Sequence, residues 1–139
     1  MADIEIISSL LQDALFKVSD MSYQPGKLRF AFVANRFRWE AETPGDKKTK
    51  GLKIYQRVRS GLRFEGVLGA KYLNLPVADK SRVLSLLTIG GTRKKGIYTL
   101  TLTFSGDIVI RLEAEVLEVY LEDLSGPWGT LNHPEHPVT

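Results

Sequence analysis

Residues 98–104 alternate between apolar and polar side chains more strictly than the rest of the chain. Four apolar residues are separated by three threonines: Tyr98, Leu100, Leu102 and Phe104, with Thr99, Thr101 and Thr103 between them. Successive side chains of a strand point to opposite faces, so this pattern predicts a strand with one buried and one exposed face.

Weaker forms of the same pattern predict further strands over residues 16–23, 28–40, 52–59, 62–72 and 107–112, and a nearly continuous apolar run predicts one over residues 82–89. Turn residues separate them. Residues 24–27 (Gln-Pro-Gly-Lys) predict a turn of type II character, and Ser60-Gly61 predicts a tight hairpin connection. Residues 90–96 form a predicted basic hairpin loop, and Ser105-Gly106 marks a further turn.

The strand over residues 28–40 contains a break in phase. Its apolar residues stand at even positions up to Ala34 and at odd positions from Phe37 to Trp39. A one-residue bulge near Ala34-Asn35, or a sharp bend, would return both sets to one face. Such a bend lets a sheet curl toward a barrel.

Two segments have the period of a helix. Residues 4–15 follow a possible N-cap, Asp3, and residues 113–124 carry apolar and acidic residues on opposite sides. The apolar sets are Ile4, Ile7, Leu11, Ala14 and Leu15 in the first, and Val116, Leu117, Tyr120, Leu121 and Leu124 in the second. The acidic side of the second consists of Glu115, Glu118, Glu122 and Asp123.

These elements predict one α+β domain over residues 1–139, with six or seven curled, mostly antiparallel strands and an amphipathic helix at each end. Their order is similar to that of the pleckstrin-homology-like half-barrel, and a flatter helix-backed sheet is the alternative. Residues 41–51 are expected to be a mobile basic loop. Residues 125–139 are expected to be an irregular tail held at the surface by Trp128.

Several classes of site are disfavoured by composition. The chain has no cysteine, which removes disulfides, thiolate metal sites and cysteine nucleophiles. His133 and His136 flank Glu135, but Pro134 and Pro137 prevent a helix from aligning them and the chain has no other His or Cys, so no metal site and no cofactor are predicted. No long apolar run or basic leader is present, and the expectation is a cytoplasmic protein with no membrane contact.

Charge is distributed unevenly along the chain. Residues 47–95 hold thirteen of the nineteen Lys and Arg residues but two of the sixteen acids, whereas residues 96–139 hold one cation and seven acids. A block of this sign can attract an anionic partner. The predicted basic hairpin supplies the candidate partner-binding residues: Lys47, Lys48, Lys50, Lys53, Tyr55, Arg57, Arg59 and Arg63.

Three functions are compatible with these residues. The first is a non-enzymatic binding module that contacts an acidic protein or a nucleic acid through the basic hairpin, with Tyr55 stacking on a base in the second case. The second is an enzyme or sensor for a small anionic ligand near Arg36, Arg38 and Glu40, which otherwise form a structural ion-pair cluster. The third is a homodimer that joins the basic face to the acidic C-terminal helix. No catalytic residue is predicted, because both histidines lie in the tail.

Four short segments occur together in one order: LQDA (residues 11–14), NRFRWE (35–40), GLRFE (61–65) and PEHP (134–137). With these segments the chain resembles an uncharacterised domain-of-unknown-function family of small bacterial proteins, mainly alphaproteobacterial. The resemblance implies one intact domain. It implies no activity and no catalytic residue.

Overall fold

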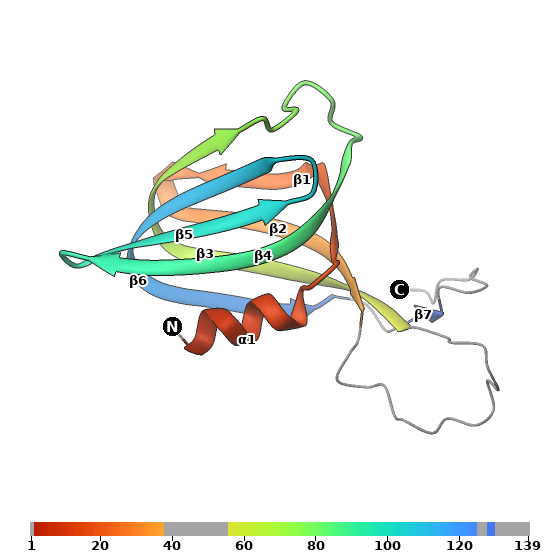
Figure 1. Cartoon of the computed structure of the whole chain (residues 1–139), viewed down its shortest axis with the longest axis horizontal. Helices are drawn as coiled ribbons and strands as arrows, with labels where there is room; N and C mark the ends of the chain where they lie inside the picture. Colours follow the sequence, from red (N-terminus) through yellow and green to blue (C-terminus); the bar gives the residue numbers. More distant parts are fainter. Residues whose placement is uncertain (1, 38–55, 125–127, 130–139) are drawn as a thin grey trace.

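The alternating segments form one antiparallel sheet in the computed structural model, which describes residues 2–37, 56–124 and 128–129 (Figure 1). Within these ranges the chain runs through a single helix and seven strands: α1 (Ala2–Leu10), β1 (Leu15–Gln24), β2 (Arg29–Phe37), β3 (Gln56–Leu73), β4 (Val83–Lys94), β5 (Ile97–Phe104), β6 (Ile108–Asp123) and β7 (Trp128–Gly129). A 3-10 turn, η1 (Pro25–Lys27), joins β1 to β2.

The first six strands close into a ring. The sheet has the order β2-β1-β4-β5-β6-β3-β7, and an additional pairing of β2 with β3 joins its ends. Every pairing is antiparallel. Closure gives each of the six strands a neighbour on both sides over at least part of its length. The prediction of curled antiparallel strands is therefore confirmed, whereas a half-barrel of pleckstrin-homology type is not.

The barrel interior is filled by alternate residues of these strands. Phe16 meets Phe32 and Phe104 edge-on, with ring centroids 5.4 and 5.5 Å apart, and all three side chains are buried. Edge-to-face packing of this kind adds to the stabilisation from burial. Ile4 of α1 and Leu11 are also buried, so the N-terminal segment covers part of the same core.

The predicted helix over residues 113–124 is wrong, because β6 continues to Asp123 as a strand. Its inward residues stand at even positions up to Ala114 and at odd positions from Leu117 to Leu121. The phase changes at an irregularity where Val67 pairs with Ala114 and Glu65 with Glu118. Beyond it, apolar residues stand on both faces of the strand: Leu117 and Leu121 pack on the core, whereas Val116, Tyr120 and Leu124 are exposed. Together they recur three and four residues apart, which imitates the period of a helix.

Gly66 makes this irregularity possible. Its φ is +74°, and a Cβ built on it would lie 2.5 Å from Cγ2 of Val116. Only glycine combines that backbone conformation with so close a neighbour. Val116 therefore lies directly against the backbone of β3.

The predicted hairpin at Ser60-Gly61 is also wrong, since β3 runs without interruption from Gln56 to Leu73. Both residues are paired on each side: Ser60 with Ala34 and Asp123, and Gly61 with Val33 and Glu122. Neighbouring strands that lie far away in the sequence hold this dipeptide extended. The two arms of the predicted basic hairpin, from residue 56 onward, are thus one continuous strand.

The bulge predicted near Ala34-Asn35 is absent from β2. Pairing with β3 stays in register from Arg29 to Phe37, and inward and outward residues alternate throughout. The apparent break has another cause: the inward position after Ala34 is occupied by a charged residue, Arg36. Trp39 lies outside the described residues.

Three boundaries differ from the predictions. The first helix ends at Leu10, because Asp13 takes a φ of +65° and its N–H donates to the carbonyl of Leu86 on β4. The type II turn predicted over residues 24–27 would give Gly26 a positive φ, but the residue with positive φ is Leu28, directly after the turn. The loop predicted over residues 90–96 narrows to Lys95-Gly96, both with positive φ, as a two-residue hairpin requires.

Candidate binding surface

Strand β3 carries a row of arginines on the outer face of the barrel. Val58, Ser60 and Leu62 are buried at alternate positions, so Arg57, Arg59 and Arg63 occupy the outward positions between and beside them. We call these three residues the arginine row. The sequence pattern had placed them on one face, and the structure agrees.

Arg57 is held against strand β2. Its guanidinium carbon lies 3.9 Å from the centre of the Phe37 ring, and its Nη1 donates to the carbonyl of Asn35 at 3.2 Å. Burial lowers the pKa of Arg57 below its ordinary value, while the negative charge of Asp13 opposes that shift. The half-buried guanidinium stays a cation, because the ordinary pKa of arginine is so high.

Arg63 belongs to a small charged cluster. Its Nε lies 2.6 Å from Oε2 of Glu65, although the N–H does not point at that oxygen, so the contact is an ion pair without a hydrogen bond. Arg29 donates from its Nε to the same oxygen at 2.9 Å. The Arg63 guanidinium also covers the ring of Tyr120, 4.5 Å from its centre. Glu65 is therefore shared by two arginines, and the three side chains keep a net positive charge.

Arg59 is exposed and lies between these two sites. It pairs with Asn35 of β2, and its carbonyl accepts a hydrogen bond of 2.7 Å from the N–H of Leu124. Its backbone is thus fixed on both sides while its side chain extends from the barrel.

The acids predicted on a C-terminal helix instead stand on β6 beside the arginine row. Glu118 and Glu122 are exposed, and they lie opposite Glu65 and Gly61 of β3. Acidic and basic segments that are far apart in the sequence are therefore neighbours on one barrel face. This arrangement supplies the complementary charge that a homodimer would otherwise provide.

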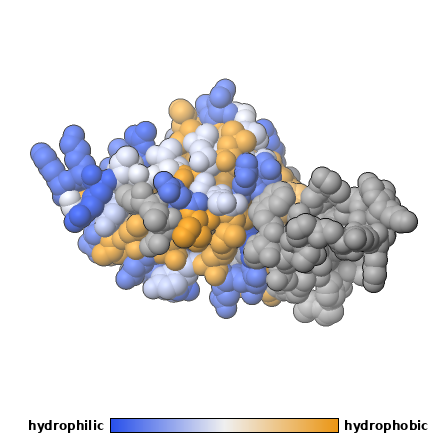
Figure 2. All heavy atoms as spheres, turned by 60° about the horizontal axis from the view of Figure 1, so that its bottom comes forward, coloured by the Kyte–Doolittle hydropathy of each residue, from blue (hydrophilic) through white to orange (hydrophobic). Residues whose placement is uncertain are grey.

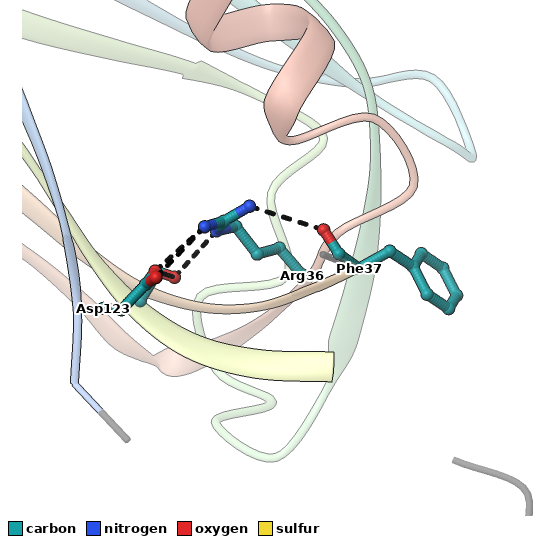
Figure 3. Close-up of polar contacts among 4 residues, drawn as sticks. Arg36, Phe37 and Asp123 are labelled. Atoms are coloured by element: carbon teal, nitrogen blue, oxygen red, sulfur yellow. Dashed lines mark hydrogen bonds and ion pairs between the residues drawn. The ribbon is translucent and has the colours of Figure 1, made fainter. Parts of the chain in front are cut away.

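A second group of polar residues joins Arg36, whose side chain is 3% exposed, to Asp123, whose side chain is 44% exposed (Figure 3). Nε of Arg36 donates to Oγ of Ser60 at 3.0 Å, and its Nη2 donates to Oδ1 of Asp123 at 3.0 Å. Ser60 in turn donates to Oδ1 of Asp123 at 2.8 Å. Nη1 of Arg36 reaches the carbonyl of Phe37 at 3.4 Å. This cluster joins β2, β3 and β6 through one buried cation.

Several candidate residues lie outside the described ranges. They are Lys47, Lys48, Lys50, Lys53 and Tyr55 of the basic segment, and Arg38 and Glu40 of the secondary candidate. The histidine pair of the tail and the expected loop over residues 41–51 lie outside them as well. Of the secondary candidate, the structure therefore places Arg36 alone.

Two searches of the described residues gave negative results. No group of three or more His, Cys, Asp or Glu side chains in them is arranged to hold a metal ion. None of their helices has both the length and the apolar character to cross a membrane.

One feature that was not predicted is a groove between α1 and β6. It is about 310 Å³ in volume and is lined by Ile6 and Ile7 of the helix and by residues 117–120 of the strand. The groove could not be predicted because residues 113–124 were expected to form a helix. The β-branched residues Val116 and Val119 were the available signal for a strand.

Within the described residues, the structure defines an antiparallel β-barrel protein with one short N-terminal helix and a row of arginines on the outer face of β3. The chain belongs to the family described as "Protein of unknown function (DUF2948)", whose family model matches residues 1–136. This confirms the resemblance to a domain of unknown function, while the alphaproteobacterial distribution stays a prediction. Comparisons with curated proteins and with solved structures gave no match.

Proposed function

We infer that the protein is a non-enzymatic binding module whose arginine row binds an acidic segment of a partner protein. The observation that carries this proposal is the outward placement of Arg57, Arg59 and Arg63 on one rigid strand. Alternate residues of a strand lie roughly 6.8 Å apart. Acidic side chains at alternate positions of an extended partner have the same spacing.

The covered aromatic rings favour carboxylates over nucleic-acid bases. Single-strand binders stack bases on open aromatic rings. Here Arg57 covers one face of Phe37, and Arg63 covers one face of Tyr120. An arginine fork suits a carboxylate, which it binds through two parallel hydrogen bonds.

The alternative function, an enzyme or sensor for a small anion, depended on Arg36, Arg38 and Glu40. Arg36 is buried and already holds the carboxylate of Asp123, which supports the structural interpretation of this residue. We therefore prefer the binding module. Location in the cytoplasm and formation of a homodimer stay predictions.

Fluorescence anisotropy with labelled poly-glutamate and labelled oligo(dT) tests the proposal. Arg57→Gln/Arg59→Gln should weaken poly-glutamate binding about tenfold, equivalent to roughly 1.4 kcal/mol. Lys71→Gln/Arg111→Gln is the matched control, because it removes two exposed cations that face each other on another part of the sheet. Binding should also weaken as salt concentration rises.

Two results would overturn the proposal. An equal loss in both double variants would mean that overall charge, and not the arginine row, controls binding. Tighter binding of oligo(dT) than of poly-glutamate, with a steep dependence on salt, would identify a nucleic-acid partner instead.

A further inference from the structure

The second half of β6 has a free edge. From Ile108 to Ala114 the strand pairs with β5 on one side, but β5 begins at Ile97 and does not extend beside the rest of β6. Residues 118–123 pair with β3 alone. Among the described residues, no backbone group bonds to the other edge of residues 115–122. In an antiparallel ladder, every second residue directs its N–H and C=O to such an edge.

Helix α1 forms a wall beside this edge. The groove of about 310 Å³ lies between Ile6 and Ile7 on the helix and residues 117–120 on β6. Ile6 is 57% exposed and Tyr120 is 47% exposed, so apolar surface borders the free backbone groups. Figure 2 brings this side of the molecule forward and shows hydrophobic residues gathered between hydrophilic ones.

Hydrogen bonds to β4 hold α1 and the residues that follow it on the side away from β6. Oγ of Ser8 accepts a hydrogen bond of 2.9 Å from the N–H of Ile89 on β4. After the helix, the N–H of Asp13 donates to Leu86, and the N–H of Leu86 donates to Ala14. No hydrogen bond joins α1 to β6 in the described chain. The groove is therefore open on the side where a further strand would add.

Four exposed acidic side chains stand in the groove or on the two elements that border it. Glu118 lines the groove, Glu5 stands on α1, and Glu115 and Glu122 stand on β6 before and after the lining residues. None of the four has an ion-pair partner within the described ranges. This charge would attract a basic segment and repel an acidic one.

We propose that the free edge of β6 binds an extended basic segment of a partner protein, which adds to the sheet as a strand and places apolar side chains against Ile6 and Ile7. Backbone hydrogen bonds to the edge provide affinity in this mode, and the pocket beside it selects side chains at alternate positions. A second copy of the chain is less suitable, because pairing two β6 edges would bring two sets of acids together. The free edge lies on the side of β6 opposite β3, and the groove borders the arginine row at Tyr120, whose ring Arg63 contacts.

Short peptides with alternating valine and lysine are the direct probe. The unmodified peptide should bind, whereas a peptide with glutamate in place of lysine should bind at least about tenfold more weakly. Two further peptides are N-methylated at every valine or at every lysine. Only the one whose methyl groups face β6 should lose binding, because it alone loses the bonds to the edge. Equal binding by both methylated peptides, or by the glutamate peptide, would overturn the proposal.

Variants of the protein locate the site. Ile6→Ser should weaken binding of the valine-lysine peptide about tenfold, whereas Leu73→Ser, at an apolar residue exposed to a similar extent (58%), should leave it unchanged. Glu118→Lys should also weaken it, and Arg57→Gln/Arg59→Gln should not. Circular dichroism confirms that each variant is folded. Unchanged binding by both Ile6→Ser and Glu118→Lys would contradict the proposal, as would a dimer of the chain that protects the same edge amides from exchange.

Discussion

Arg36 and Asp123 lie 87 residues apart in the sequence, yet Nη2 of the arginine is 3.0 Å from Oδ1 of the aspartate. Strand β3 lies between the two strands that carry them and contributes Ser60, which bonds to both side chains. The pair thus connects β2 to the end of β6 across β3. Arg36 is 3% exposed, so its charge depends on partners within the protein.

Replacing Asp123 should destabilise the barrel. Asp123→Ala leaves the buried guanidinium of Arg36 with fewer acceptors, and we expect a loss of about 2 kcal/mol in the free energy of unfolding. This value is below that for a fully buried pair, because the Asp123 side chain is 44% exposed. Urea denaturation measures the change.

The neighbouring residue is the control for this experiment. Glu122→Ala removes an exposed acid from the outer face and should change stability by less than about 0.5 kcal/mol. In a double-mutant cycle, Arg36→Met should reduce the effect of Asp123→Ala, because the uncompensated charge is then absent. Equal effects of Asp123→Ala in both backgrounds would show that the two residues are not coupled.

Gly66→Ala should destabilise the protein by about 2 kcal/mol or more. An alanine with φ of +74° is strained by roughly 1–2 kcal/mol, and its Cβ would also meet Cγ2 of Val116 at 2.5 Å. Gly90→Ala is the control, since nothing lies within 4 Å of its added Cβ and its φ is not positive. Thermal or urea unfolding compares the two variants, and equal stability would contradict the described irregularity in β6. Adding Val116→Ala should restore part of the loss.

Ser8→Ala should loosen α1. The Ser8 hydroxyl accepts a hydrogen bond from the part-buried N–H of Ile89, and its loss leaves that donor without a partner at a cost of about 1 kcal/mol. Hydrogen exchange of the α1 amides should accelerate more than exchange in β5. Unchanged exchange in α1 would mean that apolar packing alone holds the helix.

Tyr72 should make stability depend on pH in the alkaline range. Burial, together with a smaller contribution from Tyr23, raises the pKa of Tyr72 above its ordinary value of 10.0. The folded state then binds the phenol proton more tightly than the unfolded chain. The free energy of unfolding is therefore unaffected below pH 10 and falls as the pH rises from there through the raised pKa.

Tyr72→Phe isolates this effect, because it retains the ring that lies 6.3 Å from Phe30 and removes the titrating group. Urea denaturation of both proteins should show a steeper alkaline loss in the wild type. Parallel curves for the two proteins across this pH range would contradict the raised pKa.

Regular alternation explains which parts of the fold could be predicted. Leu100, Leu102 and Phe104 are buried as the pattern predicts, and so are Ile108, Ile110 and Leu112 at the start of β6. These assignments depend only on local alternation and burial.

The incorrect predictions share a cause that lies outside the local sequence. Ser60-Gly61 has the composition of a turn, but pairing with β2 and β6 keeps it extended. The second half of β6 appeared helical because apolar residues stand on both of its faces, and the exposed ones, Val116 and Tyr120, lie beside a helix and a strand that are distant in the sequence. Arg36 appeared to interrupt a strand because its partner, Asp123, is distant in the sequence.

The candidate site was predicted only in part, because some of its residues come from strands that are distant in the sequence. Alternation placed Arg57, Arg59 and Arg63 on one face, as the structure does. It did not indicate the rings and acids that surround them, which come from β2 and β6. The free edge of β6 could not be recognised while that segment was assigned to a helix.

Hydrogen exchange of the individual amides of residues 118–122 tests the account most directly. If this segment is a strand paired with β3 alone, amides that face β3 should exchange slowly, and those between them, which face the groove, should exchange fast. We expect this alternation of slow and fast exchange in the protein without ligand. Uniformly slow exchange over the segment would contradict it, because it would indicate a helix or a strand paired on both sides.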